Sequence, residues 1–489
     1  MSSPVRIPFS SFIKIDRQKK DPIYMQIVFQ FINAVRRNLL TEGDQLPGSR
    51  IIALELQIHR KTVIAALGEL QEQGWIRTIP GLGSFVVNPE SAKGGRIGRG
   101  GFPHPSKQAV FGFKKDFVLD PPLSEIPRHL HFTDGTPDHK IVPLEEIGRA
   151  YASVLRRETK TGIYDGGNDF FREQLSYYLN LTRGFHLSRW FMLPLNSREQ
   201  VFNVLSQLIL SPGEVVLVEE LSYYVANMIF TQVGARLLTI PLDAEGMDVE
   251  YIAAHFRPGE IRAVYLNPRS QYPTGVRLSA SRKSRLLELA EILDFVVIED
   301  DGDFEFSAPK DHNKPLLQMK GGERVIHLGA FGRYLPPEFQ MYFMIGPRDF
   351  IIEGEKYLNV VGRPKFLMEK SLGEIIHQGD IHRYQRKIQK TLSERKQKFA
   401  ELLHLHFADV IDFSVPQTGL AFWITFNKPI SLRLLQEEAG QRGLVIPGFC
   451  LYQNINITAI RLGFAHLGLK ELELATEKLK EAYTAVVNR

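Results

Sequence analysis

Short apolar runs that alternate with longer, helix-length segments constrain the fold of this chain more than any other feature. Runs that are apolar along most of their length are typical of strands buried on both faces, and the segments between them are long enough for crossover helices. From about residue 130 onward the sequence therefore predicts an α/β domain with a mostly parallel central sheet. The runs are EVVLVEE (214–220), ARLLTIPL (235–242), RAVYLNP (262–268), FVVIEDD (295–301) and RVIHLGAF (324–331).

Polar residues at the ends of these runs mark the expected site. Asp300 and Asp301 end one run, residues 268–275 (PRSQYPTG) follow another, and Arg333 follows a third. Ligands of open α/β sheets bind beside the carboxyl ends of the strands, so we expect these residues to gather there.

Length and composition indicate more than one domain. The chain has 489 residues, of which 44% are hydrophobic and 24% charged, and this exceeds one ordinary domain. No uncharged apolar run approaches the roughly 20 residues that span a bilayer, and the first residues lack a secretory signal pattern, so we expect a cytoplasmic protein. The single cysteine, Cys450, excludes an internal disulfide and a cysteine metal cluster and favours a small buried residue.

Charge is divided unevenly along the chain. Residues 1–115 hold 17 Lys and Arg against 8 Asp and Glu, a net charge of +9, whereas the remainder holds 43 against 47, a net charge of −4. A basic segment joined to a mildly acidic one suggests a module that binds a polyanion. A solvated surface that keeps the protein soluble remains the alternative.

Residues 22–43 predict an amphipathic helix. Asp21 is a candidate N-cap, Pro22 occupies a first helical position, and Gly43 ends the pattern. The apolar residues at helical spacing are Ile23, Ile27, Phe31, Val35 and Leu39.

The following segment predicts a helix-turn-helix. A short helix begins near Ser49, the chain turns at residues 57–59, and a second helix continues to Gly74. The second helix has a core stripe of Val63, Ala66, Leu67 and Leu70, which leaves His59, Arg60, Lys61 and Thr62 exposed at the end where such a helix meets DNA.

Residues 75–87 (WIRTIPGLGSFVV) predict a β-hairpin around Gly81 and Gly83. Glycine presents no side chain, so the tip of this hairpin can approach a phosphate backbone closely. Three helices followed by a hairpin make a winged helix.

This N-terminal segment resembles the DNA-binding domain of the GntR family. Three stretches, LPGSR (46–50), HRKTV (59–63) and GLGSFV (81–86), match the family signatures in order and spacing. The resemblance implies double-stranded DNA as a partner, with contacts from Arg50, Arg60, Lys61, Thr62 and Gly83. Arginine can grip phosphate or guanine edges bidentately, whereas lysine and threonine more often fix the register on phosphates.

Two features qualify this assignment. Arg50 and Arg60 could equally be solvated helix residues, and Ile64 stands where many relatives carry a polar or basic residue. We expect residues 1–87 to form the DNA-binding domain and residues 88–129, which are rich in Gly, Pro and basic side chains, to form a linker.

Residues 130–489 resemble the fold-type I aminotransferase-like domain that follows a GntR domain in the MocR subfamily of regulators. The matching stretches, in order, are TDGTPDHKIVP (133–143), IYDGGNDFFREQLSYYL (163–179), NPRSQYPTG (267–275), VVIEDDGDFEF (296–306) and HLGAFGRYLPPEF (327–339).

The resemblance implies a domain built to hold pyridoxal phosphate (PLP). Asp300 matches the acid that pairs with the pyridine nitrogen, Tyr223 the aromatic that stacks on the ring, and Arg461 the arginine that grips the substrate carboxylate. A core aromatic and a surface salt bridge are the alternatives for Tyr223 and Arg461.

Four other family elements are replaced. Gly332 and Arg333 stand at the serine-lysine pair, Gln340 at the phosphate arginine, Gly302 at a tyrosine that bonds the cofactor, and NSREQ (196–200) at the phosphate cup. The guanidinium of Arg333 stays protonated and is no nucleophile towards an aldehyde. We therefore expect no covalent PLP.

Noncovalent binding stays open at this stage. PLP would have to rely on Asp300, Tyr223, Arg198 and Arg333, and the pocket could instead hold a different anion or nothing. Lys310, Lys314 and Lys320 lie in a polar loop, so we expect them in solvent and expect no relocated imine.

The sequence thus favours a DNA-binding transcriptional regulator whose large domain makes a dimer and senses a small amine or anion without catalysis. The resemblance implies a head-to-tail homodimer. A PLP-dependent aminotransferase-like enzyme that uses a non-standard lysine is the alternative, and a dimerisation scaffold with a collapsed pocket is a third possibility.

Overall fold

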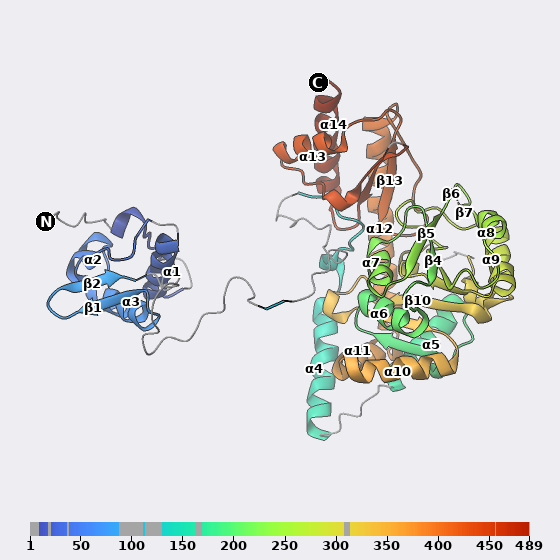
Figure 1. The fold of residues 1–489 in the computed structure, drawn as a ribbon, viewed down its shortest axis with the longest axis horizontal. Helices are drawn as coiled ribbons and strands as arrows, with labels where there is room; N and C mark the ends of the chain where they lie inside the picture. Colours follow the sequence, from blue (N-terminus) through green and yellow to red (C-terminus); the bar gives the residue numbers. More distant parts are fainter. Residues whose placement is uncertain are drawn as a thin grey trace. The chain divides into compact units, whose positions relative to one another are not determined.

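The computed structural model describes residues 9–17, 21–36, 39–87, 111–112, 130–161, 169–307, 313–454 and 456–488 (Figure 1). The chain divides into two compact units, residues 1–114 and 115–489. The division falls within the expected linker, of which only residues 111–112 are described. None of the helices in the described ranges is long and apolar enough to cross a membrane.

The N-terminal unit is a winged helix, as its sequence predicts. Its core joins Phe31, Ile52, Val63, Ile76 and Val86, one residue from each of its three α-helices and two strands. The elements are a 3-10 helix (Phe9–Ser11), α1 (Ile23–Arg36), α2 (Ser49–Glu55), α3 (Arg60–Glu72), β1 (Ile76–Ile79) and β2 (Gly83–Val86), with β1 and β2 antiparallel.

The prediction for the end of the first helix was wrong. α1 ends at Arg36, and the side chain of Leu39 is 55% exposed. The amides of Leu39 and Leu40 both donate to the carbonyl of Ala34, so the chain turns there and buries Leu40.

The large unit is built on a seven-stranded sheet, and every apolar run of the sequence forms one of its strands. Five neighbouring strands are parallel, while β11 runs antiparallel to both β10 and β3. The order across the sheet is β3 (Met192–Leu195), β11 (Met341–Ile345), β10 (Val325–Phe331), β9 (Val296–Asp300), β8 (Ala263–Leu266), β4 (Val215–Glu219) and β5 (Arg236–Ile240).

Helices cover both faces of this sheet, which explains why the runs are apolar along most of their length. Along β9, Val297 packs into one core and Ile298 into another, because successive side chains of a strand point to opposite faces. One core joins the strands to α6 (Arg198–Ile209), α7 (Tyr224–Gln232) and α10 (Arg348–Val361), and the other joins them to α8 (Val249–His255) and α9 (Ala280–Leu293).

The remaining helices and a second sheet complete the large unit. α14 packs against α12 and α13, next to β13 (Figure 1). The helices are α4 (Leu144–Thr161), α5 (Asp169–Arg183), α11 (Phe366–His377), α12 (Asp380–Phe407), α13 (Leu432–Gln441) and α14 (Leu469–Val487). The antiparallel second sheet has the order β12 (Ile411–Phe413), β13 (Ala421–Phe426), β15 (Thr458–Gly463), β14 (Leu451–Gln453), and β6 (Leu242–Asp243) pairs with β7 (Gly246–Met247).

Candidate functional site

The start of α3 presents basic side chains to solvent. His59 caps the helix by accepting a hydrogen bond from the amide of Lys61, and Nε of Arg60 donates to Oγ of Ser49 over 3.2 Å. Arg50, Arg60 and Lys61 are exposed, and Thr62 is half-buried. The free backbone amides at a helix N-terminus attract anions, so at this end of α3 the partial positive charge of the backbone adds to the charges of the exposed basic side chains.

The wing is anchored to the two helices beside it. Thr78 of β1 donates to Gln71 of α3 over 2.9 Å, and Gln45, ahead of α2, donates to the carbonyl of Leu82 at the hairpin tip over 2.7 Å. Gly83 has a φ of +115°, which side chains rarely adopt. The expected DNA contacts Arg50, Arg60, Lys61, Thr62 and Gly83 thus all belong to α2, α3 and the wing, which are tied together by these bonds.

Ile64 and the wing border one groove. This groove has a volume of about 670 Å³ and lies between α3, the hairpin and the segment before α2. The side chain of Ile64 is 49% exposed and that of Leu82 is 63% exposed. The groove between α3 and the wing is therefore partly apolar.

In the large unit, Asp300 lies at the end of β9 and is buried. One carboxylate oxygen accepts hydrogen bonds from Arg198 and from the hydroxyl of Tyr265, the latter over 2.9 Å. The other oxygen accepts from the amide of Gly302 over 3.2 Å. Both oxygens of Asp300, the acid expected to pair with the pyridine nitrogen, therefore already accept hydrogen bonds from groups of the same chain.

Arg198 also covers the aromatic face expected to stack on the cofactor. Its guanidinium carbon lies 3.8 Å from the ring centre of Tyr223. Burial alone would lower the pKa of Arg198, but Asp300, with Tyr223 and Tyr265, outweighs this and holds the pKa well above its usual value. Arg198 is therefore a permanent cation between Asp300 and Tyr223.

Arg461, on β15, is paired with a carboxylate of the same chain. Its Nε lies 2.6 Å from Oδ1 of Asp134, whose other oxygen accepts from Tyr272 over 2.7 Å. Burial raises the pKa of the Asp134 carboxyl, and Arg461 opposes this shift. The arginine expected to grip a substrate carboxylate already holds one.

Arg333 and Gln340 bond groups in and beside the loop that follows β10. Arg333 forms an ion pair with Asp303, and its amide donates to Glu305 over 2.8 Å. The side-chain amide of Gln340 donates to the carbonyls of Arg333 and Leu335, over 3.1 and 2.9 Å. These bonds hold the loop conformation and engage both side chains within it.

The space left between these groups is too small for PLP. A cavity of about 30 Å³ is bordered by Arg198, Tyr272, Asp300, Asp303 and Arg461, among others. That volume admits about one water molecule, whereas small-molecule sites usually measure about 300–1,000 Å³. The described residues therefore do not fit PLP in this arrangement.

The lysines considered as substitutes do not lie at this site either. Lys314 and Lys320 are exposed, and Lys310 lies outside the described residues. Lys283 is buried, but its ammonium donates to Asn313 and to the carbonyl of Lys314. Among the lysines named here, none that the structure describes contacts Asp300 or Tyr223.

Comparison with known proteins agrees with both units. Residues 23–86 match the family model "Bacterial regulatory proteins, gntR family". The chain is 26% identical to the uncharacterized HTH-type transcriptional regulator YdfD of Bacillus subtilis, over 95% of this chain and 96% of that protein. It is 23% identical to the probable rhizopine catabolism regulatory protein MocR of Rhizobium meliloti, over 96% of each.

The chain thus has a GntR-type winged helix at its N-terminus and is similar, over nearly its whole length, to HTH-type regulators that include MocR. Its large unit also resembles the crystal structure of an archaeal alanine:glyoxylate aminotransferase, with a TM-score of 0.67 and 22% identity over 73% of this chain and 91% of that one. At this identity the likeness shows that the large unit has the aminotransferase fold.

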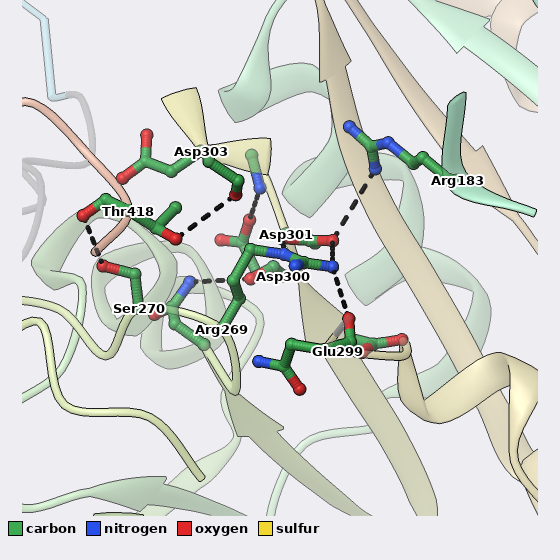
Figure 2. Close-up of polar contacts among 12 residues, drawn as sticks. Arg183, Arg269, Ser270, Glu299, Asp300, Asp301, Asp303 and Thr418 are labelled. Carbon is green, nitrogen blue, oxygen red and sulfur yellow. Dashed lines mark hydrogen bonds and ion pairs between the residues drawn. The ribbon is translucent and has the colours of Figure 1, made fainter. Parts of the chain in front are cut away.

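A second polar cluster of the large unit lies beside the first (Figure 2). Arg269 holds Asp301 through two contacts, of 2.7 and 3.2 Å, and Arg183, the last residue of α5, approaches Asp301 to 3.6 Å. Arg183 also lies 3.2 Å above the ring centre of Phe304. Burial alone would raise the pKa of Asp301, but both arginines outweigh it and lower that pKa. This cluster ties α5 and the loop after β8 to the end of β9.

Sequence reasoning missed several residues of these clusters. Asp134 and Arg269 stand within motifs that carry the resemblance, TDGTPD and NPRSQYPTG, so the motifs contained the signal. Tyr265 and Arg183 had no such signal, because a tyrosine inside a strand and an arginine at a helix end are typical of ordinary core and surface positions. Only the folded chain brings these residues to Asp300 and Asp301.

Proposed function

We propose that this MocR-type regulator binds specific sites on double-stranded DNA in the cytoplasm through α3 and the wing, and that its aminotransferase-like domain makes a dimer without catalysing transamination. The observation that carries the DNA assignment is the exposed, basic N-terminal end of α3, with Arg60 held by Ser49. In a helix-turn-helix, that end of the second helix enters the major groove.

The chemistry of the contacts follows from the side chains. Arg60 leads α3, where a guanidinium can donate two parallel hydrogen bonds to the O6 and N7 atoms of guanine. The exposed Lys61 and Arg50 carry positive charges suited to phosphates, and Gly83 lets the backbone of the wing approach the duplex. Thr62, half-buried, has a hydroxyl that can bond a phosphate oxygen.

The absence of catalysis is supported by the loop after β10 and by the filled pocket. At position 333 the chain has an arginine that remains protonated and pairs with Asp303, so no free amine is supplied there. The cavity of about 30 Å³ has no room for a coenzyme and a substrate. An effector would have to open this cavity or bind elsewhere and favour one arrangement of the dimer.

A homodimer would present two winged helices to repeated half-sites. The resemblance to MocR-type regulators supports a head-to-tail arrangement. Sedimentation of the full chain with and without DNA tests this part: a monomer that binds one half-site with full affinity would contradict it.

An aminotransferase-like enzyme with a non-standard lysine is not favoured. It would require an amine beside Asp300, where the described residues place Arg198. Reduction of the protein with borohydride in the presence of PLP, followed by mass spectrometry of peptides, would reveal a specific imine if this alternative holds.

Selection of binding sites from random-sequence DNA is the decisive experiment. We expect the full chain to enrich a repeated motif with a fixed spacing between half-sites. Enrichment of no motif, with binding that depends only on salt, would contradict a sequence-specific regulator.

A further inference from the structure

Arg198 occupies a slot that has the properties of a ligand site. The slot is bounded by the buried carboxylate of Asp300 and by the ring face of Tyr223, and the guanidinium contacts both. A carboxylate at one edge and an aromatic face on one side recognise a flat cation, which is what a guanidinium is.

The placement of Arg198 is not explained by local helix preferences. It is the first residue of α6, where a positive side chain is disfavoured by the positive end of the helix dipole. Its Nε has no hydrogen-bond partner among the described residues. The contacts with Asp300 and Tyr223 must therefore hold the side chain in place.

The other end of the cavity has a complementary arrangement. Arg461 would be an anion receptor, and Asp134 supplies the anion, with Tyr272 bonded to the same carboxylate. Arg198 and Arg461 border the same cavity of about 30 Å³. The guanidinium of Arg198 thus fills the position of a cation beside Asp300, and the carboxylate of Asp134 fills the position of an anion beside Arg461.

We propose that Arg198 is a built-in occupant of this site, which takes the place of a flat cationic ring and excludes PLP, so that its removal creates a binding site for small planar cations. This disagreement between the fold and its expected cofactor does not depend on DNA binding. It also goes beyond the loss of the lysine, because the ring site is closed by a different residue.

The test uses the full chain and its Arg198→Ala variant. Methylguanidinium can restore the contacts to Asp300 and Tyr223, so millimolar amounts should raise the unfolding midpoint of Arg198→Ala by about 2–4 °C and leave the wild-type midpoint unchanged. Tetramethylammonium at equal concentration carries the same charge but is not flat and donates no hydrogen bond, so it should have no effect. Arg285→Ala is the matched control and should show no rescue; it removes an arginine of α9 that is paired with Glu250 of α8 and with Glu288 of α9.

Pyridoxamine phosphate tests the wild-type pocket directly, because its amine forms no imine with surface lysines. We expect no change in the wild-type unfolding midpoint. A rise in that midpoint, or equal effects of methylguanidinium on wild type and on folded Arg198→Ala, would overturn the proposal.

If Arg198→Ala does not fold, a cycle of conservative variants replaces it. Arg198→Gln and Asp300→Asn each leave one partner of the pair unmatched, so the double variant should lose less stability than the two single losses together. Additive losses in this cycle would contradict a direct role of the pair in closing the site.

Discussion

The arginine at position 333, where the resemblance implies a lysine, does not by itself explain why the pocket is so small. Arg333 is bound to Asp303 and lies on a loop that Glu305 and Gln340 hold, whereas the ring position is filled by Arg198. In our proposal, two separate residues therefore prevent covalent attachment of PLP and close its site. Reversal of one should not restore the other.

We therefore expect Arg333→Lys to form no imine with PLP. The new ammonium would keep Asp303 as its partner, and Arg198 would still cover Tyr223. Borohydride reduction and peptide mass spectrometry check this, with Lys314 and Lys320 as exposed lysines that report nonspecific labelling. Stoichiometric labelling at position 333 in the single variant would show that the pocket opens more easily than we infer.

At the start of α3, arginine and lysine should make separable contributions to DNA binding. Arg60→Ala should cost about 1–3 kcal/mol on the selected operator and relax specificity at one base position, because a bidentate contact would be lost. Lys61→Ala should weaken binding to all sequences alike and reduce the slope of log K against log salt by about 1. Titrations at several salt concentrations distinguish these effects. Unchanged affinity in both variants would contradict the assignment of α3 as the recognition helix.

At the scale of elements, the sequence predicted best where burial on both faces imposes one pattern. All of the apolar runs became strands, since a strand between two helical layers buries side chains on both faces and is apolar along most of its length. The end of α1 was missed because Leu39 fits the helical spacing of the preceding apolar residues. In the folded domain Leu40 is buried instead of Leu39, and the sequence pattern alone does not distinguish these two neighbours. Asp134 and Arg461 come from distant parts of the chain, so no local pattern could pair them.

The wing provides a prediction at this scale. Gly83→Ala should destabilise the hairpin by about 1–3 kcal/mol, because a φ of +115° is unfavourable for alanine and its Cβ would lie 3.2 Å from Nε2 of Gln45. Gly68→Ala is the matched control: it lies within α3, has open space at the Cβ position and should raise stability by up to about 1 kcal/mol. Thermal unfolding and operator titrations of both variants check this. A stable Gly83→Ala that binds DNA normally would argue against close approach by the wing.

At the scale of the whole molecule, buried carboxyl groups link stability to pH. Burial raises the pKa of Glu219 and of Glu369 to about 8 and that of Glu305 to about 7. Burial also lowers the pKa of His466 to about 4. As the pH falls below the usual pKa of a histidine, the unfolded chain takes up this proton first, so His466 opposes the effect of the three glutamates. Between roughly pH 5 and 8 the folded chain therefore holds more protons than the unfolded chain, so its stability should fall as the pH rises.

Glu219→Gln tests this linkage. Glu219 ends β4 with one carboxyl oxygen that lacks a hydrogen-bond partner among the described residues, and its neutral form favours the folded state. The free energy of unfolding of the wild type should decline through the folded-state pKa of about 8, and the variant, which has no proton to lose at this position, should decline less. One pKa unit corresponds to about 1.4 kcal/mol, so between pH 5 and 9 the wild type should lose a few kcal/mol more of its free energy of unfolding than the variant.

Exposed Glu220→Gln is the control on the adjacent residue. Urea unfolding of all three proteins at pH 5, 7 and 9 measures the difference, and parallel declines for the wild type and Glu219→Gln would show that Glu219 does not carry the linkage.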